Sequence, residues 1–134
     1  MEEKVLFVDD DDLVLACFQR MLSRHFNVDT APGPWEGLHA ISTKGPYRVV
    51  VSDMRMPRLN GIQFLTKARE LAPDMVGIIL SGNLDDFTME FEALGRNEIF
   101  KVLPKPCPHD QLIDSIKEAI AYKHKQRKSN PHER

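Results

Sequence analysis

Short apolar runs alternate with longer amphipathic stretches along this chain, and this alternation limits its fold more than any other feature. Strands are predicted at Val5 to Val8, Asn27 to Thr30, Val49 to Ser52, Val76 to Leu80 and Lys101 to Leu103. The stretches between them have apolar residues at helical spacing. Strands that alternate with helices in this way form parallel sheets covered by crossover helices. The sequence therefore predicts an α/β protein.

The predicted helices carry start and stop signals that agree with this pattern. Apolar residues recur at helical spacing from Leu13 to Leu22, which predicts the first helix. A second helix opens at Gly33-Pro34 and stops at Gly45-Pro46, and a third runs from about Asn60 to Leu71. A fourth runs from about Leu84 to Leu94 before Gly95, and a last one begins at Pro108. Five predicted strands thus alternate with five predicted helices.

The chain has the size and composition of one folded domain. It has 134 residues, of which 42% are hydrophobic and 28% charged, so it has enough apolar material to form a core. No apolar run approaches the roughly 20 residues of a membrane span. The acidic start, Met1 to Lys4, is unlike a secretory signal. The two cysteines, Cys17 and Cys107, are too few for a disulfide framework. We therefore expect a cytoplasmic protein without a membrane segment.

The net charge of -2 hides an acidic body and a basic end. Residues 123–134 carry a charge of +4, which leaves -6 for residues 1–122. We predict one domain over 1–122, followed by a basic polar tail over 123–134. This tail is interpreted as a solvated helix end or the start of a linker. Nucleic-acid contact is the less favoured interpretation, because no recognition module accompanies the charge.

Polar and charged residues follow several of the predicted strands directly. Asp9 and Asp10 follow the first strand, Asp53 the third, Ser81 the fourth and Lys105 the fifth. In open parallel sheets, ligands bind at the carboxyl ends of the strands. If the first and third strands are neighbours, the three carboxylates converge, and a hard cation such as Mg2+ would offset their repulsion.

This set of groups suits phosphoryl transfer. That reaction depends mainly on alignment and on charge neutralisation by a metal, a lysine and hydrogen-bond donors. A carboxylate can itself act as the nucleophile and form an acyl phosphate. Taken alone, Asp11 and Asp12 have a simpler interpretation, because acidic residues favour helix N-termini.

Four motifs in register resemble one known family, the receiver domains of two-component response regulators of the chemotaxis-regulator type. The motifs are Phe7-Val8-Asp9-Asp10-Asp11, Ser52-Asp53-Met54-Arg55-Met56-Pro57 with Asn60-Gly61, Leu80-Ser81-Gly82, and Leu103-Pro104-Lys105-Pro106. The resemblance covers about residues 3–122. It implies a single doubly wound, flavodoxin-like (βα)5 fold whose five parallel strands have the order 2-1-3-4-5.

The resemblance also implies a role for each matching residue in phosphoryl transfer. Asp53 would be the phosphoacceptor and would take the phosphoryl group from a phosphohistidine on a sensor histidine kinase or phosphotransfer protein. Ser81 would hydrogen-bond the phosphoryl oxygen, and Lys105 would pair with it. A cis peptide bond is implied between Lys105 and Pro106.

The implied cofactor is Mg2+. The carboxylates of Asp10 and Asp53 and the backbone carbonyl of Arg55 would hold it directly, and Asp9 would act through a bound water molecule.

Two further sites are interpreted from their position in the family pattern. Val102 stands where the family often has an aromatic switch residue, and Phe100 is expected on the same face if the strand is regular. Our hypothesis is that movement of Ser81 is read out by the surface around helix four and strand five, without an aromatic flip. Arg55 and Asn83 match positions that in this family tune how quickly water removes the phosphoryl group, so the resemblance implies this role for them.

The leading functional interpretation is a signalling switch. Phosphorylation of Asp53 would alter the face formed by helix four, strand five and helix five. That face would control a partner, an output domain beyond residue 134 or a second copy of the chain. Such a protein is not an enzyme except in assisting its own phosphorylation and dephosphorylation.

Two alternatives stay open. A haloacid-dehalogenase-type phosphatase would use Asp9, Asp11 and Ser81, but it leaves the motif from Asp53 to Pro57 unexplained. A receiver-like binding module that is never phosphorylated is the other.

Overall fold

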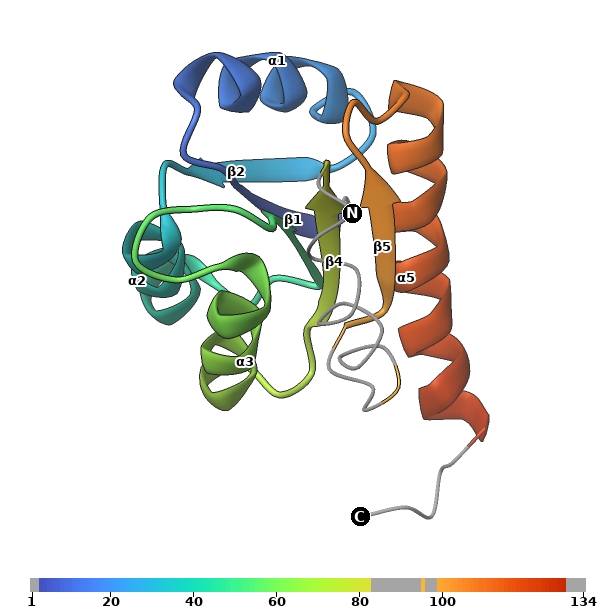
Figure 1. Cartoon of the computed structure of the whole chain (residues 1–134). Coiled ribbons are helices and arrows are strands. Elements are labelled where there is room, and N and C mark those ends of the chain that lie inside the picture. Colours follow the sequence, from blue (N-terminus) through green and yellow to red (C-terminus); the bar gives the residue numbers. More distant parts are fainter. Residues whose placement is uncertain (1–2, 83–94, 96–98, 130–134) are drawn as a thin grey trace.

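The computed structural model describes residues 3–82, 95 and 99–129, with side chains described up to residue 122. Its elements are β1 (Lys4–Val8), α1 (Asp12–Leu22), β2 (Asn27–Ala31), α2 (Pro34–Lys44), β3 (Val49–Asp53), α3 (Gly61–Leu71), β4 (Val76–Ser81), β5 (Lys101–Pro104) and α5 (His109–Ser129) (Figure 1). All five predicted strands are confirmed. The predicted fourth helix, 84–94, lies outside the described residues.

The five strands form one parallel sheet in the order β2-β1-β3-β4-β5, which confirms the predicted order. The register pairs Val8 with Ser52, and Asp53 with Leu80. The carboxyl ends of β1, β3 and β4 therefore meet at one edge of the sheet. The loops that leave this edge carry the acidic residues singled out in the sequence.

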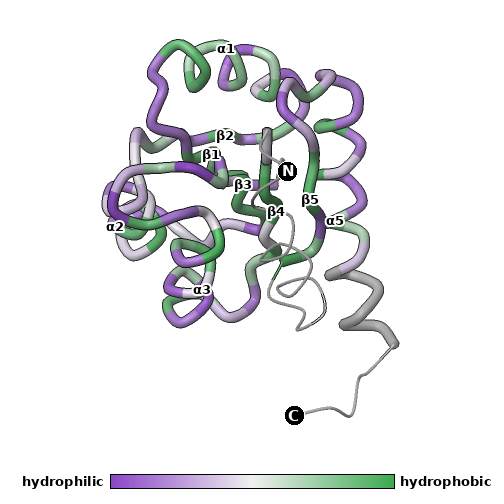
Figure 2. The backbone as a smooth tube through the Cα atoms, in the orientation of Figure 1, coloured by the Kyte–Doolittle hydropathy of each residue, from purple (hydrophilic) through white to green (hydrophobic). Residues whose placement is uncertain are grey.

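The central strands are buried on both faces, because helices cover each side of the sheet (Figure 1). Phe7, Val51 and Ile78 pack in one core with α1 and α5, whereas Val50 and Ile79 pack in a second core with α2 and α3. Figure 2 shows the hydrophobic residues concentrated on these strands. Alternate strand residues thus anchor helices on opposite faces.

Side-chain caps fix where the helices beside the carboxyl edge begin. The Asp11 carboxylate accepts hydrogen bonds from the backbone N–H groups of Leu13 and Val14, which satisfies free donors in the first turn of α1. Asn60 and Gln63 form a reciprocal capping box at the start of α3. The capping interpretation of Asp11 is confirmed.

The last helix, α5, runs past residue 122, where the sequence analysis placed the end of the domain. The helix continues to Ser129, so the predicted boundary at residue 122 falls inside a continuous helix (Figure 1). The first part of the basic tail is therefore helical. Whether it acts as a helix end or as a linker stays a prediction.

One expectation about β5 is wrong. Phe100 packs with the α1 and α5 core and lies against Tyr122, with ring centroids 5.1 Å apart, whereas Val102 packs with the α2 and α3 core. The strand begins only at Lys101, and Phe100 lies in a bend before it. The alternation of faces holds only within an extended strand, so the two side chains are on opposite faces of the sheet.

The peptide bond between Lys105 and Pro106 is cis, as the resemblance implied, and the bond between Gly45 and Pro46 is also cis. Over the described part of the chain, no helix combines the length and the apolar character that crossing a membrane requires.

Gly61 is packed too closely for a side chain. A Cβ atom at this position would lie 2.6 Å from the Asp53 carbonyl oxygen and 2.7 Å from Ile79 Cδ1. We predict that Gly61→Ala lowers the free energy of unfolding by about 1–3 kcal/mol, because the loop after β3 must shift. Urea denaturation measures this change. Lys67→Ala, an exposed substitution on the same helix, is the matched control, and equal stabilities of the two variants would contradict the prediction.

Candidate functional site

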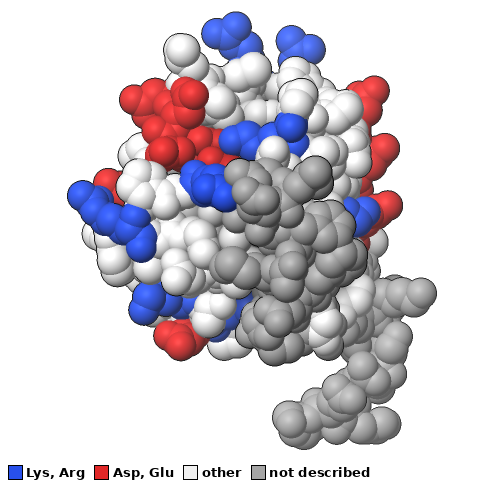
Figure 3. Space-filling view, viewed as in Figure 1, with Lys and Arg blue, Asp and Glu red and all other residues white. Residues whose placement is uncertain are grey.

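Three carboxylates converge at the carboxyl edge of the sheet, as the strand order predicts. Asp9, Asp10 and Asp53 each offer an oxygen within 4.8 Å of the others. Asp9 follows β1 and is fully buried, Asp53 ends β3 and is 6% exposed, and Asp10 is exposed. Figure 3 shows acidic surface gathered beside Lys and Arg side chains on this part of the molecule. The cluster is partly open to solvent and partly inside the protein.

Lys105 brings a positive charge to the two buried carboxylates. Its Nζ lies 3.1 Å from Asp53 Oδ1 and 3.8 Å from Asp9 Oδ2. The Lys105 backbone N–H donates to the Ser81 carbonyl at 3.0 Å, which continues the pairing of β4 with β5 beyond the strand ends. The sheet itself therefore holds the lysine against the acidic residues.

Burial dominates the protonation of both inner carboxyls. Desolvation raises the pKa of Asp9 from 3.8 to about 6, although the backbone N–H of Asp11 opposes the shift. Desolvation also raises the pKa of Asp53, against the charge and hydrogen bond of Lys105 and a hydrogen bond from the Arg55 backbone. Both carboxylates are thus less stable in their charged form than an exposed aspartate would be.

The residues present fit a hard divalent cation. Asp9 Oδ1 accepts a hydrogen bond of 2.9 Å from the Asp11 backbone N–H. Asp9 Oδ2 is buried and accepts no hydrogen bond from any described residue. Mg2+ prefers oxygen ligands. A buried carboxylate oxygen without a hydrogen-bond donor is one that an ion or a water molecule can satisfy.

Ser81 and Arg55 also lie at this edge. Ser81 ends β4, is partly buried, and pairs in register with Pro104, the residue before Lys105. Arg55 is exposed, and its backbone contacts the Asp53 carboxylate. The structure therefore brings together the predicted carboxylates, the serine, the lysine and the Arg55 main chain.

Two predicted positions remain. Val102 packs with the α2 and α3 core. Asn83 lies outside the described residues.

Ser52 is a residue at the site to which the sequence analysis assigned no role. It is fully buried, and its Oγ donates a 2.9 Å hydrogen bond to the Asp53 carbonyl. The sequence feature that could have pointed to Ser52 is its position as a polar residue at the end of the apolar run Val49 to Val51.

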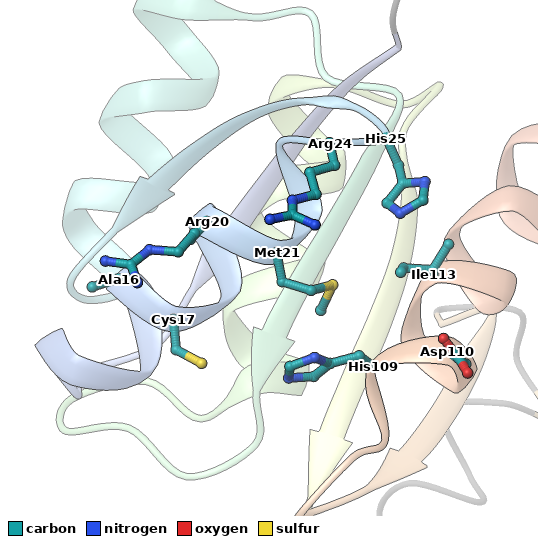
Figure 4. Close-up of a pocket in the computed structure, with 9 residues that line it drawn as sticks. All are labelled: Ala16, Cys17, Arg20, Met21, Arg24, His25, His109, Asp110 and Ile113. Atoms are coloured by element: carbon teal, nitrogen blue, oxygen red, sulfur yellow. The ribbon is translucent and has the colours of Figure 1, made fainter.

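A separate groove lies between α1 and α5, with a cavity volume of about 600 Å³. Figure 4 shows its lining residues, which are Ala16, Cys17, Arg20, Met21, Arg24, His25, His109, Asp110 and Ile113. None of the clustered carboxylates lines it. Cys17 is an exposed free thiol, and Cys107 is a buried one.

The fold and the site together define a class: flavodoxin-like α/β proteins with an acidic cluster and a lysine at the carboxyl edge of the sheet. Within that class, residues 5–117 match the response regulator receiver domain family. The chain belongs to this family. The match favours a receiver over a haloacid-dehalogenase-type phosphatase.

Curated relatives include regulators of transcription. The chain is 36% identical over 118 residues to the hydrogenase transcriptional regulatory protein HoxA of Cupriavidus necator, which covers 87% of this chain and 24% of the relative. It is 31% identical over 119 residues to the transcriptional regulatory protein GlrR of Escherichia coli, covering 87% and 26%. The chain thus spans about a quarter of the length of these relatives.

Solved structures share the fold over nearly the whole chain. A crystal structure of adenylate cyclase from Rhodopirellula baltica matches with a TM-score of 0.91 and 33% identity, covering 98% of this chain and 96% of that chain. A response regulator receiver domain protein from Clostridium thermocellum matches with a TM-score of 0.83 and 31% identity, covering 91% and 97%.

The raised pKa of Asp9 predicts a pH-dependent gain in stability for Asp9→Asn without Mg2+. The native state holds the Asp9 proton more tightly than the unfolded state does, so wild-type stability falls as the pH rises from 3.8 to about 6. The variant avoids this loss. In EDTA, we expect a gain of about 3 kcal/mol at pH 7.5 that shrinks steadily towards pH 4.

Urea denaturation across this pH range measures the gain. Asp114→Asn, an exposed substitution on α5, is the control and should show no such pH dependence. A gain from Asp9→Asn that is the same at pH 4 and pH 7.5 would contradict the assignment.

Proposed function

We propose that this receiver domain is a phosphorylation-dependent switch in which Asp53 accepts a phosphoryl group from a phosphohistidine. The donor would be a sensor histidine kinase or a phosphotransfer protein. The observation that carries the proposal is the Asp53 carboxylate at the sheet edge, 3.1 Å from Lys105 Nζ and clustered with two further carboxylates.

In the proposed step, an Asp53 carboxylate oxygen attacks phosphorus and forms an acyl phosphate. The bond between phosphorus and the donor histidine nitrogen breaks, and its electron pair stays on that nitrogen. The Lys105 ammonium is already at the carboxylate and can turn to the phosphoryl oxygens. The Ser81 hydroxyl donates a hydrogen bond to one of them. These groups act by positioning and charge neutralisation, so the domain assists only its own phosphorylation and dephosphorylation.

Mg2+ is the proposed cofactor. Asp10, Asp53 and the backbone carbonyl of Arg55 would hold it, and Asp9 would contact it through water. When bound, Mg2+ supplies positive charge that offsets the carboxylates and the transferred phosphoryl group. The buried Asp9 oxygen without a hydrogen-bond donor supports this assignment.

The proposed output is a change in the face formed by helix four, β5 and α5. A phosphoryl group on Asp53 would draw Lys105 and Ser81 towards it. Ser81 ends β4, and Lys105 directly follows β5. Val102 and Phe100 pack in the cores on opposite faces of the sheet, which supports a readout without an aromatic flip. The partners would be an output domain beyond residue 134, a separate protein or a second copy of the chain.

Phosphorylation at Asp53 can be tested directly with a small phosphodonor. After incubation with Mg2+ and acetyl phosphate, intact mass spectrometry should detect one hydroxylamine-labile phosphoryl adduct in the wild type and none in Asp53→Asn. Omission of Mg2+ should abolish or greatly slow its formation. Absence of any adduct would favour the receiver-like binding module that is never phosphorylated. An adduct that persists in Asp53→Asn would reject Asp53 as the acceptor.

Arg55 is expected to prolong the phosphorylated state. Its side chain is a long cation two residues after Asp53, where it can pair with a neighbouring carboxylate and restrict the attacking water. Arg55→Ala should therefore shorten the lifetime of the adduct after the phosphodonor is removed. Decay of the adduct mass over time gives this lifetime, with Lys67→Ala as a surface-charge control. An unchanged lifetime would count against the role of Arg55.

A further inference from the structure

Ser52 is a fully buried polar residue in β3, directly before Asp53. Its Oγ donates a hydrogen bond of 2.9 Å to the Asp53 carbonyl and lies 4.0 Å from Met56 Sδ. A buried hydroxyl is costly unless it is hydrogen-bonded, and an apolar side chain here would continue the run from Val49 to Val51. Packing alone therefore does not account for a hydroxyl group at this position.

The Asp53 carbonyl lies just beyond the pairing of β1 with β3, although β3 still pairs with β4 at Asp53 and Leu80. The pairing of β1 with β3 ends at Val8 and Ser52, one residue before Asp53. Gly61 packs against this carbonyl so closely that a Cβ atom would lie 2.6 Å from its oxygen. The Ser52 hydroxyl thus supplies a donor to a main-chain oxygen at the point where the β1–β3 ladder has ended.

The segment 53–56 turns away from β3 through a bend at Met54. The Ser52 hydroxyl bonds the Asp53 carbonyl at the start of this turn and lies 4.0 Å from the Met56 side-chain sulfur at its end. Arg55 lies between Asp53 and Met56 in the chain, and its backbone hydrogen-bonds the Asp53 carboxylate. The Arg55 carbonyl is also a proposed Mg2+ ligand. Ser52 is therefore placed to fix the turn that directs the Arg55 main chain at the site.

We infer that Ser52 is a positioning residue, whose hydroxyl holds the turn 53–56 so that the Arg55 backbone N–H fixes the Asp53 carboxylate for phosphoryl transfer. It acts through the main chain and touches neither the carboxylate nor the transferred group. The catalytic consequence rests on the proposed function, whereas the effect on the turn does not.

Amide hydrogen exchange of the Mg2+-free protein, followed by NMR, tests the effect on the turn. In Ser52→Ala we expect the Arg55 amide hydrogen to exchange about tenfold faster, because weakening one hydrogen bond lowers the protection of that amide by about this factor. The Val50 amide, in the same strand, reports general loosening and should change less. Ser52→Thr keeps the hydroxyl and should restore protection, and Ser52→Cys, with a weaker donor, should fall between.

The matched control is Ser115→Ala, which removes another buried serine hydroxyl, on α5 and away from the turn. It should leave the Arg55 amide unchanged. The inference is overturned if Ser52→Ala changes Arg55 no more than Val50, or if Ser115→Ala changes Arg55 equally.

The rate of adduct formation with acetyl phosphate at saturating Mg2+ tests the catalytic consequence. We expect a rate about tenfold lower for Ser52→Ala, because small displacements of a reacting group are costly, and recovery in Ser52→Thr. An unchanged rate beside faster Arg55 exchange would overturn the positioning role. If the wild type forms no adduct, the proposed function fails, while the exchange data still decide whether Ser52 holds the turn.

Discussion

The burial of two carboxylates around one ammonium group is the interaction on which the rest of this structure depends. Asp9 and Asp53 are both almost removed from water, and Lys105 Nζ lies within 4 Å of an oxygen of each. Buried like charges raise one another's pKa and destabilise the fold unless positive charge or hydrogen-bond donors offset them. The backbone N–H groups of Asp11 and Arg55 offset part of this cost. The charge that remains without a partner is what supports the proposal that the site binds a cation and accepts a phosphoryl group.

The parallel sheet makes this arrangement possible, because it anchors each charged residue at the end of a different strand. β1, β3 and β5 are held by two apolar cores, so the ends of the strands cannot move apart to relieve the repulsion. The loops beyond those ends are fixed by caps and close packing, as at Asp11 and Gly61. The packing of the two cores thus holds the charged groups of Asp9, Asp53 and Lys105 close together despite the repulsion between the carboxylates.

Local patterns explain how much of this could be predicted from the sequence. The strands and the described helices follow from hydrophobic periodicity and from punctuation by Gly and Pro, which act over a few residues. The positions of Asp9, Asp53 and Lys105 follow from the strand ends and the four motifs. The face on which Phe100 packs depends on where β5 begins, which the local pattern does not show. The helical form of residues 123–129 is not predicted by periodicity, because polar residues at the end of a helix carry no periodic signal.

The sequence by itself determined the fold class, the strand order through the family pattern, and which side chains stand at the carboxyl edge. Only the tertiary structure decided the depth of each carboxylate, the double contact of Lys105, and the contacts of the Ser52 hydroxyl with the turn that carries Arg55. The physical reason is that desolvation and charge pairing depend on distances between residues far apart in the chain, such as the 52 positions between Asp53 and Lys105. Those distances exist only once the sheet has formed and the helices have closed over it.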